Sequence, residues 1–418
     1  MRHGLTANAI RVMQTAPIIS LVVICFLSTL PGAFAAGPGF SGITATADSA
    51  ETVANNPAGM MRLKKPSLYG NPLIMYTRSE TEVSAPSTGR KQTTSDESFI
   101  AMPGLSYARP LGERWAIGIG PNAAMGLGAS YDDEWVGRYL IQEWSLTFAG
   151  LSPAVACRFN RQVSVGASAP IMYSRYTLEK AVFNLDPGAD DGSLELESDG
   201  WGVGATIGIL YEPTENTRFG LVYRSKISVT QEDTPEFSNL TQERIDLLNR
   251  FGALDQEISF DTSAPQIATF GVFHDFRNGW TCSLDAAWVD FSDWGFEDVA
   301  VGDSEVTTRS GNYKDIWAVS IGINRELTPK WIAGSGAFYA SSPLDDEDRT
   351  AFTRFDEMWG LGLGIEYHFQ RERSVSFDMT YIQFGEGRFQ VQDAPVVGDL
   401  EGEYTTNYAI VFGVAVTH

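Results

Sequence analysis

Apolar and polar residues alternate with a period of two along several long stretches of the chain. The alternation is clearest in residues 360–369, where one face of an extended chain would carry Leu361, Leu363, Ile365, Tyr367 and Phe369. The opposite face would carry small or polar residues: Gly360, Gly362, Gly364, Glu366 and His368. The pattern returns in residues 201–211, 317–323 and 410–416. Successive side chains of a strand point to opposite faces, so these stretches predict β-strands with one apolar face.

The connections between the predicted strands alternate in length. Short turns are expected at residues 110–113, 160–162, 213–216, 277–279, 326–329 and 370–373. Long polar loops are expected at about 78–98, 123–143, 179–198, 232–263, 293–312, 342–354 and 389–402. This alternation predicts an all-β fold, a closed antiparallel barrel of about 14 strands that spans an outer membrane. Aromatic residues at the ends of the apolar rows favour the same fold, and a secreted β-sandwich or solenoid is the alternative.

The N-terminus has the features of an export signal. Arg2 and Arg11 precede an apolar run at residues 16–30, and Ala33-Phe34-Ala35 follows as a small-x-small cleavage site. We therefore expect residues 1–36 to be a signal peptide. No later apolar stretch reaches the ~18–20 residues that a membrane helix needs. An exported chain without such a helix is either soluble or a closed barrel, since only helices and closed barrels satisfy every backbone group in lipid.

Residues 37–65 do not follow the strand pattern. They are rich in Gly, Ala, Ser and Thr and end near Asn56-Pro57-Ala58. Composition allows either a disordered tail or a folded piece lodged in the barrel. We expect the folded piece, a plug of residues 37–65, and we expect residues 66–418 to form the barrel.

Charge and the scarce reactive residues limit the function further. The net charge is −22, which argues against nucleic acid as a partner.

Cys157 and Cys282 fall inside predicted strands, so no disulfide is expected. Only three histidines follow the signal peptide, and His274 and His368 are expected beside short inner turns, away from the outer face where the active site of a barrel enzyme would work. The chain is therefore not expected to be an enzyme. No cofactor is expected, and the acidic segments at 186–199 and 345–348 lack the spacing of a calcium loop, so no metal is expected either.

Five segments in order along the chain carry a family resemblance. They are Ser41-Gly42 with Asn56-Pro57-Ala58, Gly126-Leu127 with residues 131–139, residues 208–212 with Tyr223-Arg224-Ser225, Tyr313-Lys314-Asp315 with Trp317, and residues 343–359. In these segments the chain resembles the FadL-type long-chain fatty-acid transporters of Gram-negative outer membranes, a family whose members also carry aromatic hydrocarbons. The resemblance implies passive transport of a hydrophobic ligand, with no cofactor, through a barrel plugged by an N-terminal hatch.

The resemblance also implies where the ligand is captured and where it leaves the barrel. Capture would occur outside, on a loop that carries Leu127, Tyr131, Trp135 and Tyr139. Exit would occur sideways, where the third strand is kinked. Gly120, Pro121, Gly126 and Gly128 interrupt that strand, because proline removes a donor and glycine often marks a bulge. A harmless bulge is the alternative. Lipid, lipopolysaccharide and the barrel-assembly machinery are the other expected partners, although the C-terminal His418 is atypical for that machinery.

The inward rows of the predicted barrel decide between a transporter and a porin. They are small and weakly polar, which suits a plugged lumen with an apolar pocket better than a water channel. A general or ion-selective porin is the alternative. Arg175 and Lys314 are the basic residues that we expect inside, as partners for a ligand carboxylate. The alternative for each is a pair with a nearby acid, for example Lys314 with Asp315.

Overall fold

The computed structural model describes residues 42–418 except 187, 293, 295–296, 302–303, 306–311 and 371–372. For residues 123–125, 127, 297–301 and 304–305 it describes the backbone alone. The signal peptide predicted for residues 1–36 lies outside the described residues.

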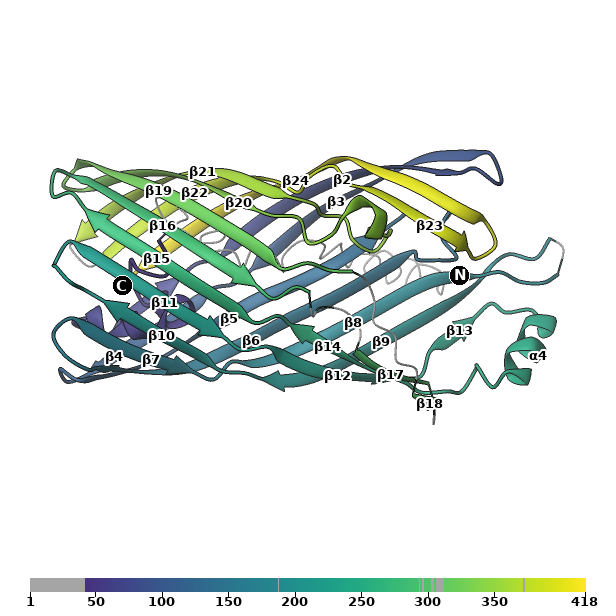
Figure 1. The fold of residues 1–418 in the computed structure, drawn as a ribbon, viewed down its shortest axis with the longest axis horizontal. Coiled ribbons are helices and arrows are strands. Elements are labelled where there is room, and N and C mark those ends of the chain that lie inside the picture. The colour runs from purple at the N-terminus through teal and green to yellow at the C-terminus, as the bar shows by residue number, and fades with distance from the viewer. Residues whose placement is uncertain are drawn as a thin grey trace, which may run out of the picture.

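Fourteen antiparallel passes close into a barrel, as predicted (Figure 1). The first seven are β1/β2 (Ser67–Gly70, Leu73–Ala85), β3/β4 (Arg90–Met102, Leu105–Leu111), β5 (Trp115–Ser130), β6 (Glu143–Arg158), β7/β8 (Val163–Ser168, Ile171–Val182), β9/β10 (Gly192–Val203, Thr206–Tyr211) and β11/β12 (Thr217–Arg224, Ile227–Asp233). The others are β14/β15 (Ile258–Ala264, Ile267–Asp275), β16/β17 (Trp280–Val289, Glu297–Val301), β19 (Ile316–Thr328), β20 (Trp331–Ala340), β21 (Met358–Gln370), β22/β23 (Arg373–Gln383, Arg388–Ala394) and β24 (Gly398–Thr417). Pairing of β2 with β24 closes the ring.

Prolines stand where several passes are interrupted. Pro72, Pro103, Pro170 and Pro265 lie between the two halves of their passes. Proline cannot donate to a strand ladder, so the hydrogen bonding breaks there while the chain continues in the same direction.

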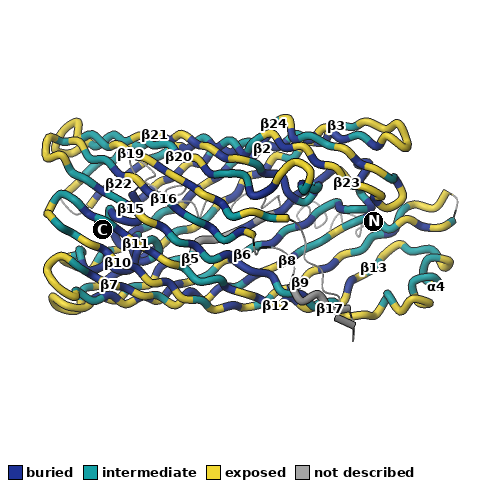
Figure 2. The backbone as a smooth tube through the Cα atoms, in the orientation of Figure 1, coloured by how far each residue is buried: buried dark blue, intermediate teal, exposed yellow. Residues whose placement is uncertain are grey.

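The predicted alternation of faces is present in the barrel wall. Along β21, Leu361, Leu363 and Ile365 are exposed on the outside, while Gly360 and Gly362 are buried inside. Figure 2 shows the same alternation of buried and exposed residues along the other strands. An exposed apolar outer surface is unfavourable in water and favourable in lipid, so these rows form the membrane-facing side.

Aromatic rings form contacts near both ends of this apolar band. Toward the end with the long loops, rings pack across neighbouring strands in the order Trp359, Tyr381, Tyr408, Tyr76 and Phe99. Near the short turns, Tyr367 packs against both Trp331 and Phe369. Two such girdles are typical of outer-membrane barrels.

Several predicted loops are instead extensions of the strands. The sequence predicts a loop at residues 78–98, yet β2 runs to Ala85 and β3 begins at Arg90. The same difference holds for residues 389–402, where β23 and β24 form a hairpin. Above the membrane the outer face meets water, so the apolar alternation fades although the backbone ladder continues.

The long loops at the outer end of the barrel contain short elements of their own. α4 (Gln242–Arg250) extends from the long-loop end together with β13 (Glu236–Ser238), which pairs with β9 (Figure 1). This helix falls within residues 235–256, where apolar residues at helical spacing predict one. The short strand β18 (Ser304–Glu305) and the 3-10 helix η2 (Asp346–Asp348) belong to other outer loops.

No helix in the described part of the chain is long and apolar enough to cross a membrane.

Candidate functional site

Residues 42–63 fold inside the barrel, toward the end with the short turns (Figure 1). They contain α3 (Thr52–Asn55) and the 3-10 helix η1 (Pro57–Arg62), and we call them the hatch segment. Pro57 begins η1, where its missing N–H costs nothing, and the side chain of Asn56 accepts from the Ala58 N–H at 3.2 Å. The Asn-Pro-Ala motif therefore sets the start of this helix.

One strand of the wall holds the beginning of the hatch segment through a carboxylate. Asp285 is buried in the inward row of β16 and accepts hydrogen bonds from the backbone N–H groups of Gly42 and Thr44. The Asn56 amide then donates to the carbonyls of Thr44 at 2.8 Å and of Ile209, on β10, at 3.1 Å. Asn56 thus ties the segment both to itself and to the wall.

Arginines hold the rest of the hatch segment. Arg224, on β11, donates to the carbonyls of Ala54 at 3.0 Å and Asn55 at 3.2 Å. Arg158, on β6, donates to the Met61 carbonyl, and Arg62 pairs with Glu212. Hydrogen bonds from charged groups are stronger than neutral ones, so contacts from several strands fix the segment in the lumen.

Inward-facing glycines form the surface on which the hatch segment rests. A methyl group added at Gly166 would lie well inside van der Waals contact with the backbone of Pro57 and Ala58. At Gly220 it would meet the Thr44 carbonyl in the same way, and at Gly208 the side chain of Asn56. The small inward rows seen in the sequence are therefore the seat of this segment.

A cavity of about 1440 Å³ lies between the hatch segment and the short turns. Asp48 and Glu51 line it from the hatch side, and Glu366 and His368 line it from the wall. Burial raises the pKa of the Glu51 carboxyl to about 8, and the neighbouring Asp48 adds to the rise.

The third pass, β5, has an irregular middle. Relative to β6 its register shifts between Asn122 and Met125, where β5 contains one extra residue. Before the shift, a methyl group added at Gly120 would lie 3.3 Å from Val53 of the hatch segment, and Pro121 lies opposite Leu151. After the shift, Gly126 and Gly128 lie opposite Thr147 and Ser145. The side chain of Leu127 lies outside the described residues.

The other edge of β5 loses its partner at the same place. β4 pairs with β5 only from Leu111 opposite Trp115 to Tyr107 opposite Ile119. Within the described chain, β3 pairs with β2 alone, and no register joins β3 to β5. Among the described strands, the edge of β5 from Gly120 to Ser130 therefore has no partner on this side.

The aromatic residues expected in the capture loop are buried. The ring of Tyr131 stacks on that of Trp135 at 4.1 Å between centroids, and the Trp135 indole donates to the Ile141 carbonyl at 2.6 Å. The Tyr139 hydroxyl donates to Asp191. These side chains hold the loop together, and a role of this loop in capture stays a prediction.

The prediction that Arg175 and Lys314 lie inside the barrel is wrong. Arg175 lies in the exposed outer row of β8, two residues beyond Tyr173, and pairs with Glu197. Lys314 lies on the loop before β19 and pairs with Asp345, with both side chains about half exposed. Each cation has an acidic partner at the surface, although for Lys314 this is Asp345 and not Asp315.

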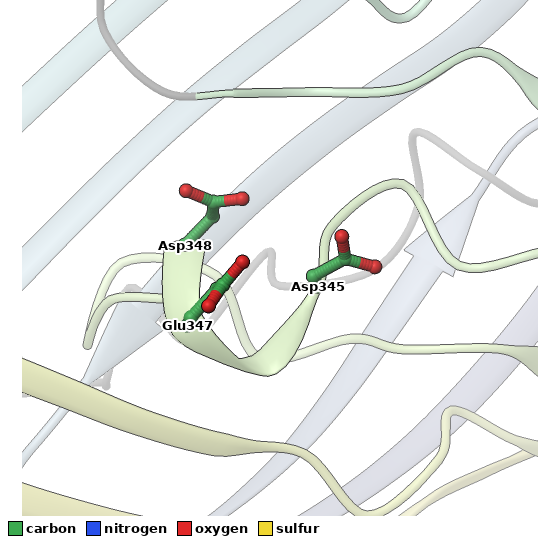
Figure 3. Close-up of side chains that lie close together, drawn as sticks. All are labelled: Asp345, Glu347 and Asp348. Carbon is green, nitrogen blue, oxygen red and sulfur yellow. The ribbon is translucent and has the colours of Figure 1, made fainter.

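Three carboxylates of an outer loop lie close together. Asp345 precedes η2, and Glu347 and Asp348 lie within it (Figure 3). Lys314 already pairs with Asp345, and the Asn312 amide donates to Asp348 at 2.8 Å. An exposed acidic cluster with such partners is ordinary surface chemistry, and we assign it no ligand.

Residues 31–418 match the sequence model of a family described as "Outer membrane protein transport protein (OMPP1/FadL/TodX)". The chain belongs to this family. The resemblance carried by the five sequence segments is thereby confirmed. As a member of this family it is an outer-membrane transport protein, and the exposed apolar rows of the barrel are its lipid-facing surface.

Named relatives align over nearly the whole chain. Long-chain fatty acid transport proteins of Salmonella typhi and Escherichia coli (strain K12) are 22% and 20% identical, over 90% of this chain and 91% and 92% of theirs. A Pseudomonas aeruginosa FadL homologue has a TM-score of 0.80 at 17% identity, covering 93% of this chain and 98% of its own. The P. putida toluene transporter TodX has a TM-score of 0.66 at 18% identity, covering 95% and 98%.

Proposed function

We propose that this protein carries hydrophobic small molecules passively across the outer membrane and releases them through the side of its barrel. The observation that carries the proposal is the combination of a clasped hatch segment with an unpaired edge on β5. The first obstructs the axial path through the lumen, and the second offers a path through the wall.

The axial path is obstructed by backbone that several strands hold. Asp285, Arg158 and Arg224 each bond the hatch segment, and Gly166 and Gly220 lie directly against it. Solutes would have to displace this segment to pass along the axis. A general porin keeps a water-filled lumen, so this arrangement disfavours the porin alternative.

The lateral path follows from the chemistry of backbone in lipid. Unpaired N–H and C=O groups are very unfavourable in hydrocarbon, so an unpaired strand edge at membrane depth must face protein or a cavity. The edge of β5 beyond Ile119 meets this condition if it borders a passage from the lumen. A ligand that leaves there enters the membrane without crossing the polar hatch segment.

The names of the relatives indicate the substrate class. Relatives named long-chain fatty acid transport protein and toluene transporter share the fold and most of the sequence length. We propose a ligand of the same kind, a fatty acid or an aromatic hydrocarbon. Passive transfer needs neither cofactor nor catalytic group, so we propose no enzymatic activity.

The outer face of the barrel and its last strand are the expected contacts for lipopolysaccharide, lipid and the barrel-assembly machinery. Arg175 and Glu197 lie on the outer face just beyond Tyr173 and Trp201, at the level of lipid and lipopolysaccharide headgroups. β24 ends at Thr417 next to β1 and closes the ring, so it is the strand we expect the barrel-assembly machinery to bind.

The proposal predicts selective flux in reconstituted protein. The purified barrel should bind an anthroyloxy-labelled fatty acid or naphthalene, because both belong to the proposed class of ligand. Liposomes that contain it should not swell in sugar solutions, because the hatch segment obstructs water-soluble solutes. Ligand fluorescence and light scattering measure the two properties on one preparation. Rapid sugar flux without binding of either probe would replace this function with that of a porin.

A further inference from the structure

The outer loop at residues 341–357 folds inward and reaches the third pass. It connects β20 to β21, yet it packs near β5 and β6, because Phe352 lies against Trp144 and the Tyr131 hydroxyl donates to the Ala351 carbonyl at 2.7 Å. Arg354, near the end of this loop, has a side chain that is only 2% exposed. A buried arginine needs partners, since an unpaired charge in the interior is very unfavourable.

Arg354 binds both strands that separate at the unpaired edge. One guanidinium nitrogen, Nη1, donates to Asp96 on β3 at 2.9 Å. The other, Nη2, donates to the carbonyl of Ser130, the last residue of β5. The guanidinium also lies over the ring of Tyr131, with its carbon 4.2 Å from the ring centroid. One side chain thus joins β3 to β5 where no backbone ladder does.

The unpaired edge of β5 therefore ends on two different kinds of contact, one at each end. At the hatch end it is closed by the backbone ladder of β4 and β5, which stops at Tyr107 opposite Ile119. At the outer end it is closed by side chains. Arg354 is the charged contact there, and the Val136 N–H donates to the Gln92 side chain at 3.1 Å. Side-chain contacts can break and re-form without unzipping a ladder, so the outer end is the adjustable one.

Side chains of β24 hold the backbone of the loop that carries Arg354. The Asn407 amide, on β24, donates to the Arg354 carbonyl. The Tyr404 hydroxyl, also on β24, donates to the Thr350 carbonyl at 3.3 Å. The carboxylate partner of Arg354 is fixed as well, because Asp96 lies within the β2–β3 ladder opposite Ser79. Separation of β3 from β5 therefore has to break the bonds of the guanidinium.

We propose that Arg354 is a latch that limits how fast a hydrophobic ligand passes through the side of the barrel. The inference rests on the proposed lateral exit and adds the residue that controls it. Arg354 acts as a positioning residue: it holds β3 and β5 together at the outer end, and the passage widens when the Asp96 bond breaks. A latch changes the barrier and leaves the bound state alone, so it sets rates of ligand transfer without setting ligand affinity.

The test compares two carboxylate-to-amide changes. Asp96→Asn removes the charged partner of Arg354 with little change of shape. Asp346→Asn removes one of the two charged partners of the neighbouring buried Arg349, which bonds Asp346, Asp356 and the Arg388 carbonyl. None of these three partners in the described chain belongs to β3 or β5. Release and binding of an anthroyloxy-labelled fatty acid and of naphthalene would be followed by stopped-flow fluorescence on protein in lipid nanodiscs.

We expect Asp96→Asn to raise both the binding and the release rate about tenfold, which corresponds to a barrier lower by about 1.4 kcal/mol. The dissociation constant should stay within about twofold. Asp346→Asn should change neither rate, and Asp96→Glu should keep the slow rates. Arg354→Gln should behave as Asp96→Asn does. If it fails to fold, as a gel shift on boiling would reveal, Asp96→Asn alone decides.

The outcomes separate the latch from the lateral exit on which it rests. A bulky residue at Gly126 should slow transfer if the ligand leaves through the side. If Gly126→Leu slows transfer while Asp96→Asn leaves both rates unchanged, the exit stands and the latch is wrong. If neither change alters the rates, both are wrong. Slower transfer in Asp96→Asn, or a change in affinity without a change in rate, would also overturn the latch.

Discussion

Deletion of residues 37–62 is expected to turn the barrel into an open water-filled channel. In the barrel, side chains of the inner surface such as Asp285 and Arg224 bind the described part of this segment. None of the described strand ladders includes residues 42–62, so the deletion leaves the ladder bonds of these strands in place. A barrel of this strand number is wider than the eight-stranded barrels whose side chains fill the interior. Single-channel conductance in planar bilayers should rise on the order of tenfold or more.

A gel shift on boiling provides the control for this deletion, because an assembled barrel migrates differently before and after heating. The deletion variant should keep the shift. If it does and its conductance equals that of the intact protein, then the hatch segment does not obstruct the lumen and the transporter proposal loses its first support.

Gly166→Val together with Gly220→Val is expected to dislodge the hatch segment without shortening the chain. The added side chains would overlap the backbone at Pro57, Ala58 and Thr44, which cannot turn aside as a flexible side chain can. Valine is well accommodated in strands, so the barrel should still assemble. Conductance should approach that of the deletion variant, and the hatch segment should become accessible to protease.

Gly70→Val is the matched control, because it also places valine in a paired strand. Its added methyl group would meet only Leu105, at an ordinary 4.0 Å. It should leave conductance unchanged. Equal conductance in the double variant, the control and the intact protein would show that the contacts at Gly166 and Gly220 do not hold the hatch segment in place.

The faces of the strands were predictable where the contrast between them is strong. In β21, leucine and isoleucine alternate with glycine, and the assigned faces are correct. In β8, Met172 and Ser174 alternate with Tyr173 and Arg175, so neither row is clearly apolar and the pattern does not decide the face of Arg175. The aromatic ring of Tyr173 was the available signal, since it belongs with Trp201 on the outer face.

The residues that hold the hatch segment were only partly visible in the sequence. Asp285 could have been found, because it is an acid in an otherwise weakly polar inward row of a membrane strand. The number of strands and the presence of short and long connections follow from local periodicity. The extent of the outer hairpins does not, since the apolar pattern ends at the membrane surface while the ladder continues.

The latch could not have been predicted from the sequence. Arg354 meets Asp96 and Ser130 across more than 200 positions of the chain. No period or motif connects these residues, and the loop that carries Arg354 has no regular structure beyond η2. Only the closed ring, together with the inward path of this loop, brings them together.

The central claim is that ligands leave through the side of the barrel next to β5, and Gly126→Leu tests it most directly. The matched control is Ala167→Leu, which adds the same side chain to the exposed face of β7, a strand paired on both sides. Uptake of labelled fatty acid and of naphthalene would be measured in cells that lack their own transporter, after the gel shift has shown that both barrels assemble. We expect Gly126→Leu to slow uptake by about tenfold or more while ligand binding persists, and Ala167→Leu to leave uptake unchanged. Unchanged uptake in an assembled Gly126→Leu barrel would contradict the account.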